Sequence, residues 1–207
     1  MLDQLNRAHR ELGSRDAGED AGRAVLMKRT YDAVIDDVWD ACTNPDRIAR
    51  WLAPVSGDLQ LGGTYQLEGN AGGEIKRCEP PKLLRVSWIF GDNPASAVEV
   101  RLAEVSSEET AFELEHMVVD ADPDFWQQFG PGAVGVGWDL ALLGLAAHLQ
   151  GEDYTQDPAE LLQTPEAKEF MTASSQAWGA AHEASGVSAE EAKGATDRTI
   201  AAYTADA

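Results

Sequence analysis

One long apolar helix candidate, GPGAVGVGWDLALLGLAAHLQ at residues 130–150, limits the folds open to this chain more than any other segment. Large apolar residues recur along it at i, i+4, i+7 and i+11, as they do on one face of a helix: Trp138, Leu142, Leu145 and Leu149. The opposite side is also apolar, and only Asp139 and His148 are clearly polar. Such a helix must be covered by other elements. It is too short and too interrupted to span a bilayer, which takes about 20 apolar residues, so we expect no membrane insertion.

Charge and cysteine content exclude several classes of partner. The 207 residues carry a formal charge of −20 and a sequence pI near 4.4, without a basic stripe that would neutralise phosphates, so we expect no nucleic-acid partner. Cys42 and Cys78 are far apart and lack CxxC spacing, and we interpret them as reduced core thiols. The N-terminal segment MLDQLNRAHRELGSRD has no apolar run. These features together predict a soluble, cytoplasmic protein.

The first third of the chain predicts a leader, a strand and two short helices. Residues 1–22 carry a weak helical stripe followed by small and charged residues, which favours a flexible or partly helical leader. AVLMKRTYDA, residues 24–33, is the first predicted strand. In residues 35–54, IDDVWDACTNPDRIARWLAP, the pair Asn44-Pro45 indicates the cap and first turn of a second short helix after a first one.

From residue 55 to 120 the apolar period changes from helical to alternating. Five strands are predicted, at residues 59–69, 72–81, 82–92, 96–105 and 110–119. The third is expected to place Leu84, Val86, Trp88 and Phe90 on one face. One apolar and one polar face are typical of an antiparallel sheet covered on a single side, and the long helix is the expected cover.

Residues 152–207 predict an α-helical extension. Thr164-Pro165 and Ser188 with Glu191 carry the signals of helix starts, and the helices are rich in alanine but poor in large apolar residues. We therefore expect the extension to pack onto the main domain, at residues 23–151, or to support a homodimer.

The glycines that precede the long helix formally match G-x-G-x-x-G at Gly130, Gly132 and Gly135. A dinucleotide site would need a buried strand of a βαβ unit just before them, but DPDFWQQF precedes and Pro131 interrupts the motif. We interpret the glycines as structural, allowing a tight turn and a close approach of the helix start to the sheet. No cofactor and no metal site are expected, since the four histidines lack ligand spacing.

Four stretches taken together resemble the START-like, helix-grip superfamily (SRPBCC), and within it the family related to the activator of the heat-shock chaperone ATPase. They are RTYDAVIDDVWDACTNPDRIARWLAP, LGGTYQLEG, GGEIKRCEPPKLLRVSWIF and GVGWDLALLGLAAHL, between residues 29 and 149. The resemblance implies an α+β fold in which a curved antiparallel sheet grips the long C-terminal helix around a cavity. Members of the superfamily hold lipids, hormones, polyketides or other apolar molecules there.

Seven residues are the predicted lining of that cavity: Trp51, Tyr65, Trp88, Phe90, Phe112, His116 and Trp138. Large rings suit a small hydrophobic or aromatic ligand, although the same rings could simply fill a core. His116 falls on the apolar face of its strand, and either a satisfied core histidine or a ligand contact fits that position. We favour a ligand-binding protein without a catalytic residue. The alternatives are an enzyme of the polyketide cyclase or aromatase kind, and an interaction module similar to a chaperone-ATPase activator.

Overall fold

The computed structural model describes residues 1–15, 22–91, 96–118, 123–152 and 161–205. Its framework is one antiparallel sheet with the strand order β1-β2-β8-β7-β6-β5-β4-β3. The strands are β1 (His9–Arg15), β2 (Gly22–Tyr31), β3 (Val55–Gly57), β4 (Thr64–Leu67), β5 (Gly72–Glu79), β6 (Leu83–Trp88), β7 (Ser96–Ser106) and β8 (Glu109–Val118). The helices are α1 (Leu2–Asn6), α2 (Ile35–Thr43), α3 (Pro45–Trp51), α4 (Pro123–Phe129), α5 (Gly132–Leu149), α7 (Pro165–Ala184) and α8 (Ala189–Thr204).

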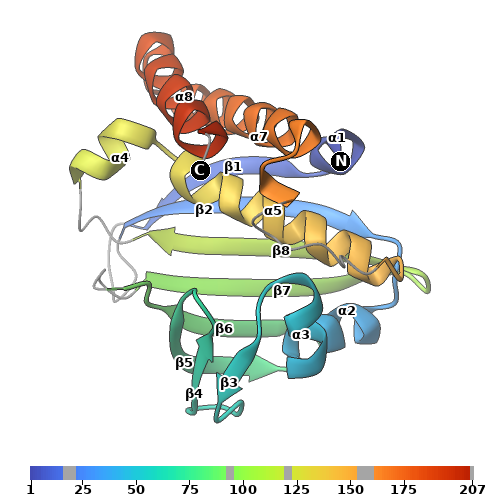
Figure 1. The fold of residues 1–207 in the computed structure, drawn as a ribbon. Helices are drawn as coiled ribbons and strands as arrows, with labels where there is room; N and C mark the ends of the chain where they lie inside the picture. Colours follow the sequence, from blue (N-terminus) through green and yellow to red (C-terminus); the bar gives the residue numbers. More distant parts are fainter. Residues whose placement is uncertain (16–21, 92–95, 119–122, 153–160, 206–207) are drawn as a thin grey trace.

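The long helix α5 lies across one face of the curved sheet, with α7 and α8 stacked on its other side (Figure 1). This arrangement confirms the predicted α+β, helix-grip fold. By length and composition α5 is the one helix of the described residues that could cross a membrane, but 67% of it is buried inside the protein. The sheet and the extension therefore cover most of the apolar surface of α5, as they do for the core helix of a soluble domain.

Local sequence signals place the helix starts correctly. The Asn44 side chain accepts a hydrogen bond from the Asp46 backbone N–H at 3.1 Å, and Pro45 follows as the first residue of α3. Ser188 caps α8 by accepting from the Glu191 N–H at 3.2 Å. Each side-chain oxygen satisfies a backbone donor that the helix itself cannot.

The outer face of the sheet is polar, as the alternation predicts. Arg101 on β7 contacts Glu99 on its own strand and Glu113 and Glu115 on β8, with 2.8 Å between its Nη2 and the Glu115 carboxylate. These charges lie opposite the apolar residues Val98, Val100 and Leu114, which face α5. The helices therefore cover the apolar face, while the opposite face of the described strands is mostly polar, apart from the buried cluster of Ala24, Ala97 and Met117.

The N-terminal residues contain the helix α1, as a partly helical leader would, and then a strand that was not predicted. Residues 9–15 form the edge strand β1, which pairs with β2 from His9↔Lys28 to Arg15↔Gly22. Arg10 on β1 reaches the buried Asp139 on α5 with two hydrogen bonds, of 3.0 Å from Nε and 2.7 Å from Nη2. A buried bidentate ion pair thus connects this strand to the long helix. Its two residues are far apart in the sequence, so local patterns do not predict it.

The glycines at the start of α5 have a structural role, but their close contacts are with the extension rather than the sheet. A Cβ added at Gly135 would lie 2.1 Å from Trp178 of α7, and one added at Gly132 would lie 2.9 Å from Thr199 of α8. Small residues here let α7 and α8 approach the α5 backbone. The extension thus covers the domain, which is the first of its two expected roles.

Candidate functional site

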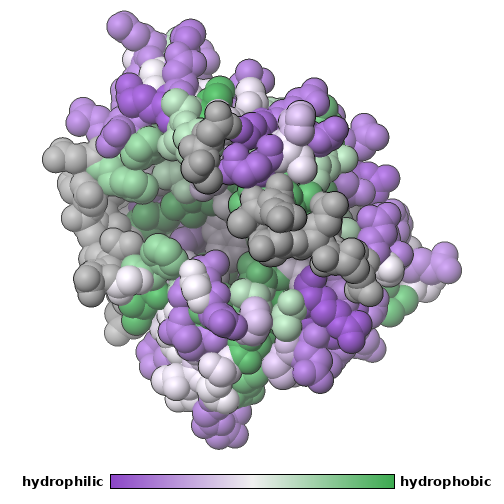
Figure 2. Space-filling view, in the orientation of Figure 1, coloured by the Kyte–Doolittle hydropathy of each residue, from purple (hydrophilic) through white to green (hydrophobic). Residues whose placement is uncertain are grey.

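An apolar cavity of about 160 Å³ lies between α5, the short helices α2 and α3, and strands β4 to β8. Green hydrophobic residues surround a hollow below α5 on this face of the molecule (Figure 2). Aromatic rings from five different elements share the wall with aliphatic side chains: Trp51, Tyr65, Trp88, Phe112 and Trp138. The sheet and the helix therefore bring together residues that are up to 87 positions apart between Trp51 and Trp138.

Five of the seven residues predicted from the sequence line this cavity, and two do not. Phe90 is 52% exposed, because β6 ends at Trp88 and the alternation does not extend two residues further. His116 is buried at 6% exposure but lies behind Trp138 rather than in the wall. The binding role of the five lining residues stays a prediction.

Two groups of lining residues were not among the predicted site residues. Cys42 from α2 and Cys78 from β5 both contribute to the wall as free cysteines. Leu59 and Gln60 come from the connection between β3 and β4, and Leu59 is 38% exposed. Their exposure places the mouth of the cavity at this connection. Ile48 and Leu52 of the α3 region also line the cavity, and their apolar character shows only that this side of α3 is buried.

Hydrogen bonds fix the protonation of His116. The indole Nε1–H of Trp138 donates to His116 Nδ1 at 3.0 Å, so Nδ1 is an acceptor. Ser96 donates its hydroxyl proton to the Trp88 carbonyl oxygen at 2.8 Å and therefore accepts from His116 Nε2, which is 2.9 Å away. His116 is thus the neutral Nε2–H tautomer with both nitrogens occupied. Burial lowers its pKa to about 4, in agreement with that state.

Cys42 and Tyr65 at the cavity are also neutral. Burial raises the pKa of the Cys42 thiol to about 12, so the thiolate needed for nucleophilic attack is scarce near neutral pH. Burial likewise raises the pKa of Tyr65, whose hydroxyl donates to the Ser87 carbonyl at 2.9 Å. The wall therefore offers apolar contact and few free polar groups.

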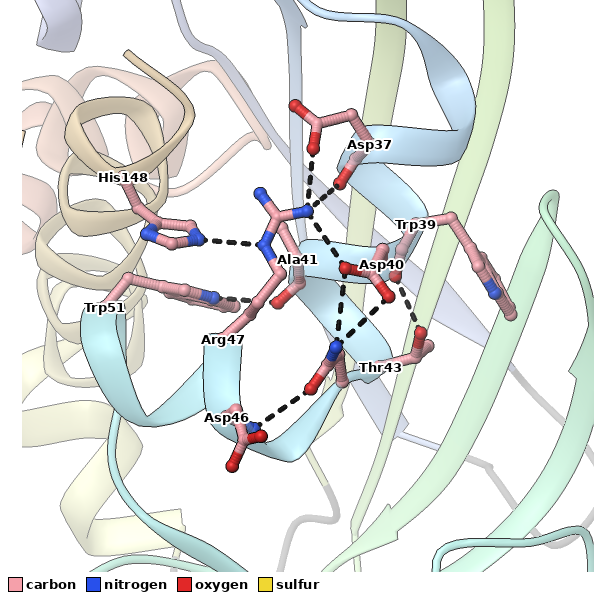
Figure 3. A network of polar contacts seen from close by, with 10 residues as sticks. Asp37, Trp39, Asp40, Ala41, Thr43, Asp46, Arg47, Trp51 and His148 are labelled. Atoms are coloured by element: carbon pink, nitrogen blue, oxygen red, sulfur yellow. Dashed lines mark hydrogen bonds and ion pairs between the residues drawn. The ribbon is translucent and has the colours of Figure 1, made fainter. Parts of the chain in front are cut away.

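A polar network holds the short helices against α5 (Figure 3). The Arg47 guanidinium on α3 donates to Asp37 at 2.7 Å and Asp40 at 3.1 Å on α2, and its Nε donates to His148 Nε2 on α5 at 3.0 Å. Neighbouring Trp51 donates its indole N–H to the Ala41 carbonyl at 2.9 Å. The position of the Trp51 ring, at this end of the cavity, therefore depends on α2, α3 and α5 together.

Glycine at position 144 allows α3 to lie this close to α5. A Cβ there would be 2.6 Å from the carbonyl oxygen of Trp51. Among the residues that the structure describes, no group of three or more His, Cys, Asp and Glu side chains could hold a metal ion.

Comparisons with known proteins agree with this architecture. The sequence family described as "Activator of Hsp90 ATPase homolog 1-like protein" matches residues 32–150. No curated protein matches the chain. The crystal structure of CalU16 from Micromonospora echinospora is 37% identical, with a TM-score of 0.70, over 84% of this chain and 97% of CalU16.

Two more distant solved structures share the fold. DynU16, from the dynemicin biosynthetic locus, is 24% identical with a TM-score of 0.56, over 63% of this chain and 48% of DynU16. PFC0360w, an HSP90 activator from Plasmodium falciparum, is 21% identical with a TM-score of 0.53, over 62% of this chain and 96% of its own. At these identities the likeness extends to the fold alone.

Proposed function

Because the chain belongs to the family of Activator of Hsp90 ATPase homolog 1-like proteins, whose fold encloses an apolar cavity here, we propose that it binds a small hydrophobic or aromatic molecule between α5 and the sheet. The observation that carries the proposal is the composition of the wall. Five rings and a set of aliphatic side chains converge on a cavity that opens at the connection carrying Leu59 and Gln60, without a charged group among them. Such walls are typical of small-molecule sites.

The volume limits the size of the ligand. A cavity of about 150 Å³ with apolar walls stays dry and takes up benzene, and this one measures about 160 Å³. Pockets that bind drug-sized ligands measure roughly 300 to 1,000 Å³. We therefore propose a ligand with one aromatic ring or its aliphatic equivalent in the cavity as it stands. A larger ligand would have to displace the exposed connection that carries Leu59 and Gln60.

A catalytic role of the polyketide cyclase kind has less support. His116 was the leading candidate for acid–base work, but Trp138 and Ser96 occupy both of its nitrogens. A general base needs a lone pair within reach of the substrate proton. Turnover of a cavity ligand that is lost in His116→Ala without loss of fold would favour the enzyme.

An interaction with a chaperone is the other alternative, and it rests on the family description and on the fold shared with PFC0360w. Stimulation of a heat-shock chaperone ATPase by the purified protein would favour it. For the location, we propose the cytoplasm, where the two free thiols at the cavity would stay reduced.

Binding is tested directly by fluorescence, since Trp51, Trp88 and Trp138 all line the cavity. We expect benzene, phenol and indole to change the tryptophan emission and to raise the melting temperature. Native mass spectrometry of the freshly purified protein should also reveal any ligand that co-purifies.

Two variants on the same strand separate the cavity from the surface. Val100→Phe fills the cavity and should abolish the response, while Val105→Phe lies at an exposed position and should leave it intact. No response to any probe up to its solubility limit, or an equal loss in both variants, would overturn the proposal.

A further inference from the structure

Several hydrogen-bond donors in the wall of the apolar cavity are already used within the protein. Four lining side chains donate their proton to a protein acceptor: Thr43, Trp51, Tyr65 and Trp138. The Thr43 hydroxyl donates to the Trp39 carbonyl oxygen at 2.8 Å, so toward a ligand it can only accept. No lysine, arginine or histidine is among the described lining residues. An anionic ligand would therefore find no cation in the wall to pair with.

The mouth of the cavity presents acceptors. Gln60 lines the cavity at this end, and its amide Nε2–H donates to the Asp58 carboxylate at 3.0 Å. Because an ionised carboxylate only accepts, the amide nitrogen must face Asp58. The amide oxygen of Gln60 is then left without a partner among the described residues. The mouth therefore offers a neutral acceptor, with a negative charge one hydrogen bond away from the same side chain.

Backbone hydrogen bonds hold this connection between β3 and β4 in place. The Asp58 N–H donates to the Thr64 carbonyl oxygen at 2.8 Å. The Gly63 N–H donates to the Gln60 carbonyl oxygen, and the Gly63 carbonyl oxygen accepts from the Ile75 N–H of β5, both at 2.9 Å. The backbone that carries Gln60 and Asp58 is therefore positioned before a ligand arrives, and this lowers the cost of binding.

We propose that the ligand of this cavity is a one-ring aromatic molecule that carries a hydrogen-bond donor, an alcohol or an amine, with the donor at the mouth against Gln60. The inference rests on the proposed function and makes Gln60 the specificity-determining residue. An aromatic acid is disfavoured, because its carboxylate would meet the Gln60 oxygen and the Asp58 charge without a cation in the wall. An ammonium would in addition be attracted by Asp58.

Four probes with the same ring and a one-carbon substituent test the proposal on the full-length protein: toluene, benzyl alcohol, benzylamine and benzoate. Each is titrated while the tryptophan emission is recorded. Gln60→Leu keeps a side chain of similar size but removes the acceptor. Benzyl alcohol and benzylamine should bind to this variant roughly threefold or more weakly than to the parent protein, the effect of one exposed hydrogen bond. Toluene should bind to it as tightly or more tightly, and benzoate should bind to the parent at least about tenfold more weakly than benzyl alcohol.

Gln127→Leu is the matched control, because Gln127 is an exposed glutamine of α4 that does not line the apolar cavity. It should leave all affinities unchanged. Asp58→Asn keeps an acceptor for the Gln60 amide but removes the charge. A loss of benzylamine affinity in Asp58→Asn, with benzyl alcohol unchanged, supports the amine as the donor, and unchanged affinities for both probes support the alcohol.

The outcomes separate this inference from the proposed function. The inference alone is overturned if toluene binds but Gln60→Leu weakens benzyl alcohol and benzylamine no more than toluene, or no more than Gln127→Leu does. Benzoate binding as tightly as benzyl alcohol would also overturn it. If none of the four probes binds, the proposed function is overturned together with the inference.

Discussion

The indole N–H of Trp138 donates to Nδ1 of His116 across 3.0 Å, so a ring in the cavity wall is held in place by a buried neutral histidine. The contact links α5 to β8, and Trp138 also packs 5.1 Å from Trp88, centre to centre. Ring orientation at this end of the cavity is therefore set before any ligand enters. Preorganisation of this kind lowers the cost of binding.

Trp138→Phe keeps an aromatic ring but removes the donor. His116 Nδ1 would then be a buried acceptor without a partner, which costs about 1–3 kcal/mol of unfolding free energy. Chemical denaturation measures the loss. Trp88→Phe is the control, because it trims the same wall and leaves the Trp138–His116 bond in place. Equal losses in the two variants would contradict a special role for the bond.

Stability should depend on pH through His116. Its pKa is about 4 in the folded protein and 6.5 in the unfolded chain, so between these values the unfolded state binds more protons. The contribution of His116 to the free energy of unfolding is fully present above pH 6.5. It falls by about 3 kcal/mol as the pH drops to 4, since one pKa unit corresponds to about 1.4 kcal/mol. His116→Gln removes this group, and the difference between the two proteins' denaturation curves isolates it from the carboxylates. A pH-independent difference would contradict the prediction.

Local signals in the sequence predicted the parts of the fold that depend on local physics. The period-2 alternation gave the one-sided sheet, and the side-chain oxygens of Asn44, Thr164 and Ser188 marked helix starts that the structure confirms. The alternation and the caps need only neighbours within a few positions. The five lining residues followed from the resemblance to the helix-grip superfamily, whose arrangement brings rings from distant elements around one cavity.

Contacts between distant residues could not be predicted in the same way. The strand HRELGSR has no apolar alternation, and it is held by pairing with β2 and by Arg10, 129 positions away from Asp139. His116 was recognised as buried, but its partners Trp138 and Ser96 depend on strand register and helix rotation. Phe90 does not line the cavity, because β6 ends where its pairing with β7 ends, at Trp88. The alternation of apolar residues in the sequence does not show where that pairing ends.

The buried carboxylate of Asp139 should be essential for stability. It accepts hydrogen bonds from Arg10 on β1 and from Ser174 and Trp178 on α7, the last two at 2.6 and 3.0 Å. Asp139→Leu leaves the Arg10 charge buried and unpaired, which costs about 3–5 kcal/mol. Removing both charges in the Arg10→Leu, Asp139→Leu double variant should recover a large part of that loss. If the double variant were less stable than Asp139→Leu, the unpaired Arg10 charge would not be the cause of the stability lost in Asp139→Leu.

Two glycines of α5 should respond in opposite directions to the same substitution. In a helix, alanine is favoured over glycine by up to about 1 kcal/mol. At Gly137 the nearest atom to an added Cβ is the Tyr203 hydroxyl at 3.7 Å, an ordinary contact, so Gly137→Ala should stabilise the protein. At Gly135 the added Cβ would lie 2.1 Å from the Trp178 ring, which is fully buried and hydrogen-bonded to Asp139.

That ring cannot move aside without losing its bond, so Gly135→Ala should cost about 1–3 kcal/mol, as overpacking in a core does. In thermal melts of a chain of this size, each kcal/mol corresponds to about 2–4 °C. The two variants should therefore melt on opposite sides of the parent protein. If Gly135→Ala were as stabilising as Gly137→Ala, the extension would not pack against α5 as closely as described, and the role assigned to these glycines would be wrong.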